Sequence, residues 1–302
     1  MRSDKASDLK LYLEEKKTYV DRALEAYCPD EGMSHLDIRT AMRYSLFAGG
    51  KRLRPILSIA GAEAVGGNAE EVLPVACALE LIHTYSLIHD DLPIMDDDDL
   101  RRGKPTSHKV FGEALALLAG DGLLTEAFNI MAMSKYPVDV QPDSILSVIG
   151  LISSAAGYRG MVGGQVVDIQ SEGKDIDISI VEFIHNHKTG ALITASVTSG
   201  AILGGGSKSQ IRSLDSYGRK IGLAFQISDD ILDIEGNSEA LGKKVGADER
   251  KGKPTYPAVA GLEKSKALQS ELVKEAINSI QSFDRKADPL RLIARYIIER
   301  KK

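Results

Sequence analysis

The spacing of apolar residues constrains the fold most strongly, because they recur at intervals of three and four positions along nearly the whole chain. Val72, Val75, Leu79 and Ile82 are one such series. This spacing places apolar side chains on one face of an α-helix. Alternating strand-like runs bounded by hairpin dipeptides are nearly absent, so we expect an all-α protein with little or no sheet.

Glycines, prolines and short polar runs divide this pattern into roughly ten predicted helices. The breaks lie at Gly66–Asn68, at Pro93, around Lys104–Pro105, at Pro137–Pro142, at Ser171–Asp177, at Gly204–Gly206 and from Gly236 to Pro257. None of the breaks is a long low-complexity linker, and the apolar periodicity continues on both sides of each. We therefore expect a single domain that spans residues 1–302.

Composition and charge limit the class of protein. The 302 residues are 43% hydrophobic and 27% charged, which is a globular composition. We find neither a signal-peptide apolar region nor about 18 uninterrupted apolar residues, so we expect a cytoplasmic protein without an integral membrane segment. Cys28 and Cys77 are expected to be reduced thiols. The net charge of −5 argues against nucleic-acid binding, so an anionic substrate must meet local cations.

A dense acidic cluster follows the most apolar predicted helix. The segment LELIHTYSLIHDDLPIMDDDDLRRG contains Asp90, Asp91 and Asp96–Asp99. Carboxylates this close repel one another and raise one another's pKa unless a cation neutralises them or water separates them. Taken alone, this segment also fits a solvated acidic loop.

A second acidic cluster, within GLAFQISDDILDIEG, does not fit a solvated loop. Asp229 and Asp233 share one face of a predicted apolar helix, and Gln226 lies one turn before them. Clustered acids on such a helix suit Mg²⁺, which takes one or two carboxylates, keeps waters and bridges to substrate phosphates.

Basic residues accompany the first cluster. GGKRLRP supplies Lys51 and Arg54, while Arg101 and Arg102 follow the acidic run directly. Guanidinium groups suit diphosphate oxygens. His83 lies two helical turns before Asp90 on nearly the same face, where it is either a core residue or part of the site.

These motifs give the chain a close resemblance to the trans-isoprenyl diphosphate synthases, also called the polyprenyl synthetase family, and most closely to its bacterial farnesyl diphosphate synthases. The resemblance covers nearly the whole chain, through GGKRLRP, HTYSLIHDDLPIMDDDDLRRG, GMVGGQ, HKTGALI, GLAFQISDDILD and GADERKGKPTYP. It implies a helical bundle around a deep central pocket, with the acidic motifs facing each other across its mouth. It also implies a homodimer.

The resemblance further implies roles for single residues. Asp90 and Asp96 would hold two Mg²⁺ ions and Asp229 a third, with Mn²⁺ as a substitute. Isopentenyl diphosphate would be bound by Lys51, Arg54, His83 and Arg102. The allylic diphosphate would be bound by Arg101, Lys188, Lys243 and Lys253. The catalytic set would be Lys188, Thr189, Gln226 and Asp230, with Thr189 and Gln226 lining the place where the allylic cation forms.

The expected reaction is Mg²⁺-dependent condensation of dimethylallyl or geranyl diphosphate with isopentenyl diphosphate. Tyr85, five residues before Asp90, is either an ordinary core tyrosine or, as the resemblance implies, the floor of the pocket, where it would favour the fifteen-carbon farnesyl diphosphate. Geranylgeranyl diphosphate is the second expectation and geranyl diphosphate the third, since the adjacent Ser86 is small. Two other functions stay open: a non-catalytic, prenyl-diphosphate-binding subunit of a hetero-oligomer, and a terpene cyclase.

Overall fold

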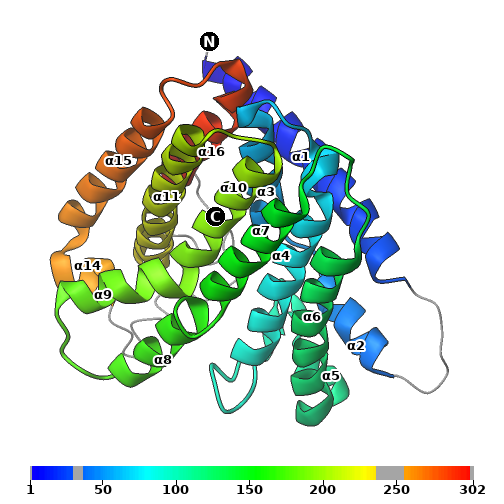
Figure 1. The fold of residues 1–302 in the computed structure, drawn as a ribbon. Helices are drawn as coiled ribbons and strands as arrows, with labels where there is room; N and C mark the ends of the chain where they lie inside the picture. The colour runs from blue at the N-terminus through cyan, green and yellow to red at the C-terminus, as the bar shows by residue number, and fades with distance from the viewer. Residues whose placement is uncertain (1, 30–36, 236–254, 300–302) are drawn as a thin grey trace.

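Helices dominate the computed structural model, which describes residues 2–29, 37–235 and 255–299 (Figure 1). The α-helices are α1 (Arg2–Tyr27), α2 (Asp37–Leu46), α3 (Leu53–Val65), α4 (Ala69–Asp90), α5 (Ser107–Phe111), α6 (Glu113–Met133), α7 (Pro142–Ala156), α8 (Met161–Ser171), α9 (Ile178–Ile184), α10 (Ala191–Leu203), α11 (Lys208–Glu235), α14 (Tyr256–Ala260), α15 (Leu262–Ser279) and α16 (Asp288–Glu299). The other elements are the antiparallel strands β1 (Leu100–Arg101) and β2 (Lys104–Pro105), the π-helix η1 (His185–Gly190) and the 3-10 helix η2 (Arg285–Ala287). The all-α prediction is confirmed.

Most of the predicted helix breaks coincide with real helix ends, for local reasons. Gly66 ends α3 in the left-handed conformation, with φ at 107°. Asn68 then caps α4, since its side chain accepts from the backbone of Glu71 while the Glu71 carboxylate accepts from the backbone N–H of Asn68. The break from Gly236 to Pro257 lies largely outside the described residues.

The described helices outnumber the roughly ten predicted, because the prediction missed short helices and two of the breaks between helices. Helices α5 and α14 have five residues each, too few for an apolar repeat to show. Gly112 separates α5 from α6, and a turn at Gly157–Gly160 separates α7 from α8. The two-residue strands agree with the expectation of little or no sheet.

Helix α4 lies at the centre of the largest apolar cluster. Every residue from Pro74 to Ile82 is buried, so this helix is enclosed on all sides. Its neighbours are α1, α2, α3, α6 and α10. In Figure 1, α4 and α11 both end on the lower side of the molecule. The fold therefore brings the two acidic motifs, which occupy these helix ends, to one side of the protein.

Candidate active site

Asp90 is the last residue of α4, and the following loop folds back onto it. The backbone N–H of Asp96 donates to the carbonyl oxygen of Asp90 at 2.8 Å. Burial raises the pKa of Asp90 to about 6, Lys188 opposes this rise, and Asp96 adds to it by repulsion. The first acidic motif thus brings Asp90, Asp96 and Lys188 into one electrostatic neighbourhood, although Lys188 is far away in the sequence.

On α11, the adjacent residues Asp229 and Asp230 make different contacts. Gln226 donates from its amide to the Asp229 carboxylate at 3.3 Å, so these two share the predicted face. Asp230 is buried; it accepts from the backbone N–H of Tyr256 at 2.7 Å and lies 3.2 Å from His185 Nε2. These contacts join α11 to α14 and η1, and the catalytic role predicted for Asp230 stays a prediction.

Lys188 and Thr189 lie in the π-helix η1, a rare element that often marks functional sites. Lys188 donates to Asp168 on α8 at 2.6 Å. Two glycines let other helices approach η1: a Cβ on Gly164 would lie 2.2 Å from the backbone nitrogen of Lys188, and one on Gly222 would lie 2.8 Å from Gly190 Cα. Helices α8 and α11 therefore fix the position of the Lys188 backbone. The ammonium group of Lys188 acts electrostatically on Asp90.

Two arginines and a neutral histidine form a cluster beside the acidic motifs. Burial lowers the pKa of Arg54 to about 10, with Glu80 and Asp229 opposing that effect and Arg102 adding to it. Burial also lowers the pKa of His83 well below its usual value, and Arg54 and Arg102 reinforce this. The predicted residues Arg54, His83 and Arg102 are therefore near one another, and Arg54 is also within electrostatic reach of Asp229.

The Nε atom of Arg54 is buried and has no hydrogen-bond partner among the residues that the structure describes. A buried guanidinium donor without a partner costs free energy. Phosphate oxygens satisfy such donors well, so this atom fits the predicted diphosphate site. Lys51, which precedes this cluster in sequence, is exposed.

Two arginines of these motifs contact protein carboxylates. Arg52 is buried and binds Glu80 at 2.7 Å and Asp21 at 2.8 Å, an arrangement that holds the segment before α3 in place. Arg101 donates to Asp91 at 2.8 and 2.9 Å. In this structure Arg101, predicted to bind the allylic diphosphate, is thus held by a carboxylate of the first motif. Arg102 donates to the carbonyl oxygen of Gly49.

Tyr85 is buried in the apolar cluster around α4. Its ring meets that of His89 edge-on, with centroids 5.5 Å apart, and His89 Nε2 lies 3.0 Å from the carbonyl oxygen of Leu117 on α6. Burial, with a contribution from Asp90, raises the pKa of Tyr85 to about 12. Tyr85 therefore packs against His89, which contacts α6, and Tyr85 lies within electrostatic reach of Asp90 in the first acidic motif.

Some predicted features lie outside what the structure describes. Lys243 and Lys253 fall in the range 236–254, beyond the described residues. The deep central pocket stays a prediction. A small cavity of about 30 Å³ lies beside the first acidic motif, and Thr84, Asp91 and Arg102 are among its lining residues.

Sequence reasoning did not single out Asp168 or His185. Asp168 is the acceptor for Lys188, and His185 contacts Asp230. Both contacts join residues on different helices, so no spacing within one helix indicates them. The one indication in the sequence is that Asp168 lies in the GGQVVD segment and His185 in the HNHKTG segment, beside residues of the motifs.

The arrangement combines oxygen ligands with a cationic wall. Asp90, Asp96 and Asp229 offer only carboxylate oxygens, which are the ligands that Mg²⁺ prefers, and the raised pKa of Asp90 indicates a site where a cation would relieve repulsion. Arg54 and Arg102 supply positive charge nearby, and the neutral His83 lies in the same cluster. Such a site suits a substrate that carries a diphosphate bridged to divalent cations.

Comparisons with known proteins agree with this chemistry. The sequence pattern of the family described as Polyprenyl synthetase matches residues 36–293. The "Heterodimeric geranylgeranyl pyrophosphate synthase large subunit 1, chloroplastic" of Arabidopsis thaliana is 50% identical over 297 residues, which cover 97% of this chain and 80% of that protein. The farnesyl diphosphate synthase of Geobacillus stearothermophilus is 49% identical over 277 residues, which cover 90% of this chain and 91% of that protein.

A solved structure shares the fold. The geranylgeranyl pyrophosphate synthetase of Pyrococcus horikoshii Ot3 superposes with a TM-score of 0.89 at 32% identity, covering 98% of this chain and 99% of the other. The helical architecture described above is thus that of known isoprenyl synthases.

Proposed function

Because the chain belongs to the polyprenyl synthetase family and is a trans-prenyl diphosphate synthase, we propose that it makes mainly farnesyl diphosphate. The substrates would be isopentenyl diphosphate and either dimethylallyl or geranyl diphosphate. Geranylgeranyl diphosphate is the alternative product, because relatives about equally similar to this chain bear both names.

The observation that carries the proposal on product length is the position of Tyr85. Its bulky ring is buried in the apolar cluster around α4, a few residues from Asp90 on the same helix. About 7.5 Å of helix separates the two residues, so an allylic chain whose diphosphate is held at Asp90 would meet this ring as it lengthens. A ring there limits the product to a shorter chain than an open floor would.

The residues of the site support a cation mechanism without a protein nucleophile. Mg²⁺, which the family uses, would be held by Asp90, Asp96 and Asp229 and would draw negative charge off the leaving diphosphate. Lys188 and Arg101 would bind the allylic diphosphate and stabilise the charge that develops as its carbon–oxygen bond breaks. Arg54, Arg102 and His83 would orient isopentenyl diphosphate, so that its double bond attacks the cation.

Two residues near the place where the allylic carbocation would form would stabilise it without covalent chemistry. The Gln226 side-chain oxygen and the Thr189 hydroxyl would face the developing positive charge, since Gln226 shares a face with Asp229. The apolar walls would exclude water, which otherwise quenches a carbocation.

The test is a product assay with purified chain, isopentenyl diphosphate and each of dimethylallyl, geranyl and farnesyl diphosphate, analysed by chromatography. We expect farnesyl diphosphate as the main product from the first two allylic substrates and little turnover of the third. Main formation of the twenty-carbon product would establish the alternative. Activity should disappear in excess EDTA and return with Mg²⁺ or Mn²⁺.

The same assay separates the other classes of function. A terpene cyclase would release hydrocarbon or alcohol from an allylic diphosphate without isopentenyl diphosphate. A non-catalytic subunit would bind allylic diphosphate and form no product alone. Both acidic motifs are complete in this chain, which favours catalysis.

We also propose that the chain forms a homodimer. Several large apolar side chains on α6, α7 and α8 are exposed, among them Leu118, Leu146 and Val166. A second copy of the chain would bury them.

A further inference from the structure

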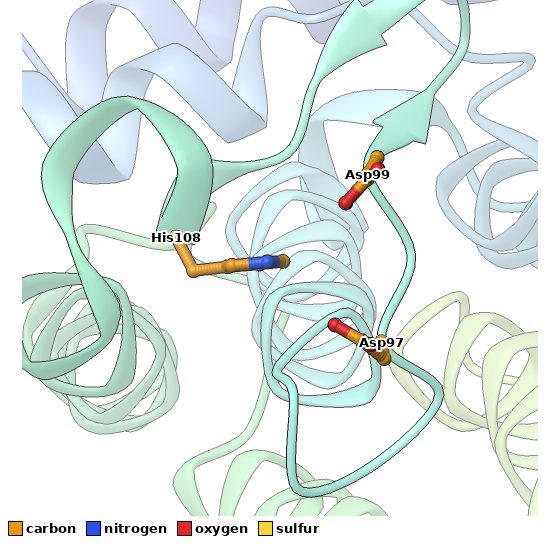
Figure 2. Close-up of side chains that lie close together, drawn as sticks. All are labelled: Asp97, Asp99 and His108. Carbon is orange, nitrogen blue, oxygen red and sulfur yellow. The ribbon is translucent and has the colours of Figure 1, made fainter.

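Three side chains around the small hairpin lie close enough to hold a metal ion that the reaction does not need. They are Asp97 and Asp99, just before β1, and His108, just after β2. One potential ligand atom from each lies within 4.8 Å of the others. Figure 2 shows His108 pointing toward the two carboxylates from the opposite side of the space between them. We propose that these residues form a binding site for a transition-metal dication, preferentially Zn²⁺, separate from the site at Asp90, Asp96 and Asp229.

The hydrogen bonds of Thr106 make His108 Nε2 a lone-pair donor. The Thr106 hydroxyl donates to the Asp98 carbonyl oxygen at 2.8 Å, so toward the ring its oxygen can only accept. His108 Nδ1 lies 3.2 Å from this oxygen and therefore carries the proton. That places the lone pair on Nε2, and a hydrogen bond to the other ring nitrogen is the usual way in which proteins set the ligand atom of a metal-binding histidine.

The surroundings of Nε2 are those of a ligand atom. His108 is only 7% exposed, and its Nε2 has no hydrogen-bond partner among the residues that the structure describes. A buried lone pair that faces two carboxylates is electrostatically unfavourable, and a cation between them removes the conflict. The rival arrangement, a doubly protonated ring that donates to a carboxylate from Nε2, would show a hydrogen bond that is not found here.

The neighbouring charges are compatible with this site. Asp98, between the two acids in the sequence, has its carboxylate 3.7 Å from the guanidinium of Arg101. Asp99 pairs with Lys109 through one carboxylate oxygen at 2.7 Å. The second oxygen of Asp99 remains available as a ligand, since a carboxylate accepts on both oxygens.

The donor set indicates the kind of ion. One imidazole nitrogen and two carboxylate oxygens suit Zn²⁺, with water in the fourth tetrahedral position, whereas Mg²⁺ favours oxygen ligands alone. Metal–ligand bonds of about 2.0–2.2 Å would require the carboxylates to move inward by roughly 1 Å. Asp97 and Asp99 are exposed, so their side chains have room for that movement.

A bound ion would join the two ends of the hairpin. Asp97 and Asp99 precede β1 (Leu100–Arg101) and His108 follows β2 (Lys104–Pro105), so the ion would close this segment into a loop. Arg101 and Arg102 lie on that segment. The ion would therefore restrict the motion of two arginines to which the proposed function gives a role in diphosphate binding, without itself contacting a substrate.

The test measures Zn²⁺ binding to the full-length chain by equilibrium dialysis with Mg²⁺ in excess, and Co²⁺ binding by visible absorption. We expect about one tightly held Zn²⁺ per chain and the intense Co²⁺ bands of four-coordinate geometry. Asp97→Asn should weaken binding at least about tenfold. The variant should fold, because Asp97 is exposed and has φ at 51°, a conformation that asparagine tolerates.

Three further variants locate the ion. His108→Gln should abolish the four-coordinate Co²⁺ bands. Asp98→Asn, which removes the same charge from the same loop, should bind Zn²⁺ like the unmodified chain. Asp90→Asn should also leave this ion in place. Equal binding by Asp97→Asn and the unmodified chain, equal loss in Asp98→Asn, or loss in Asp90→Asn would each overturn the proposal.

Discussion

At the scale of single residues, opposing charges act most directly on Asp90. Burial and Asp96 favour its neutral form, whereas Lys188 favours its ionised form, and the pKa that results is about 6. A carboxylate in this range is ionised at neutral pH and ready to bind a cation. It also loses that ability in mildly acidic solution, so we expect metal-dependent turnover to fall as the pH drops below about 6.

The same pKa gives a prediction for the stability of the metal-free protein. In the unfolded chain Asp90 loses its proton near pH 3.8, whereas in the folded protein it keeps the proton up to about pH 6. The folded state therefore binds more protons between these values, and the free energy of unfolding falls as the pH rises through this window. Asp90→Asn cannot ionise, so at pH 8 it should be more stable than the unmodified chain by on the order of 1–3 kcal/mol.

Urea unfolding in EDTA from pH 4 to pH 8 measures this difference, which should vanish near pH 4. Turnover of Asp90→Asn with Mg²⁺ should meanwhile fall by orders of magnitude. If the variant unfolded more easily at pH 8, the carboxylate would be a structural group and not a metal ligand.

Arg54 and Lys188 are predicted to act on different substrates. Arg54→Ala should raise KM for isopentenyl diphosphate by about tenfold or more, because the loss of a charge-assisted hydrogen bond costs about 1.5–3 kcal/mol. Lys188→Ala should mainly impair the allylic substrate or kcat, since Lys188 acts electrostatically on Asp90. Steady-state kinetics with each substrate varied in turn measures both.

Lys208→Ala, at an exposed position at the start of α11, is the control for loss of a positive charge and should change neither constant. Equal effects of Arg54→Ala and Lys188→Ala on both substrates would contradict two distinct diphosphate sites.

Tyr85→Ala tests the floor of the pocket. Removal of the ring should leave space beneath the growing chain and shift the main product from fifteen to twenty carbons or more, as chromatography of the products would show. Tyr85→Phe keeps the ring and should keep the product length. A fifteen-carbon product from Tyr85→Ala would mean that a different side chain sets the length.

At the scale of elements, the sequence predicted what depends on neighbours along the chain. Asn68 with Glu71, and Pro142 at the start of α7, are local signals that end or begin helices whatever the rest of the molecule does. The acidic motifs were found in the same way, because their members follow one another directly. Resemblance to a family supplied the partners that are remote in sequence, such as Lys188.

What escaped prediction depends on contacts between remote segments. The hydrogen bonds of the π-helix η1 span five residues instead of the four of an α-helix, and no local pattern in HNHKTG indicates this. The pairing of Lys188 with Asp168 joins η1 to α8. The contacts of Asp230 with His185 and with the backbone of Tyr256 also join remote segments, and the sequence did not indicate them.

Gly164→Ala tests whether η1 must pack closely against α8. Its methyl group would lie 2.2 Å from the backbone nitrogen of Lys188, so one of the two helices has to move. We expect a loss of about 1–3 kcal/mol of stability and at least about a tenfold loss of kcat, because Lys188 would move relative to Asp90. Thermal unfolding and steady-state kinetics measure the two effects.

Gly150→Ala on α7 is the matched control. Among the described residues, a Cβ there meets no heavy atom within 4 Å outside the nearby backbone of its own helix, so the change should stabilise the helix by up to about 1 kcal/mol and leave kcat unchanged. Full activity of Gly164→Ala would show that the position of Lys188 tolerates a shift of η1.

At the scale of the whole molecule, the apolar surface needs an explanation. In the described part of the chain, three stretches are long and apolar enough to cross a membrane, in α4, in α6 and across α7 and α8. The apolar window in α4 is 72% buried, so it belongs to the core. The windows in α6 and in α7–α8 are only 39% and 33% buried. These two neighbouring regions therefore present apolar surface that another molecule would cover, and a second copy of the chain is the occupant that we propose.

Leu118→Glu tests this dimer. Leu118 lies on α6 and is 52% exposed in the single chain, so a carboxylate there would not disturb the monomer core but would be buried unpaired in the proposed interface. We expect light scattering after size-exclusion chromatography to give the mass of a dimer for the unmodified chain and of a monomer for the variant at micromolar concentration. Leu11→Glu on α1, where the leucine is 63% exposed, is the control and should remain a dimer. A monomeric unmodified chain that sediments with lipid vesicles would instead assign the apolar surface to a membrane, and a dimeric Leu118→Glu variant would place the interface on other helices.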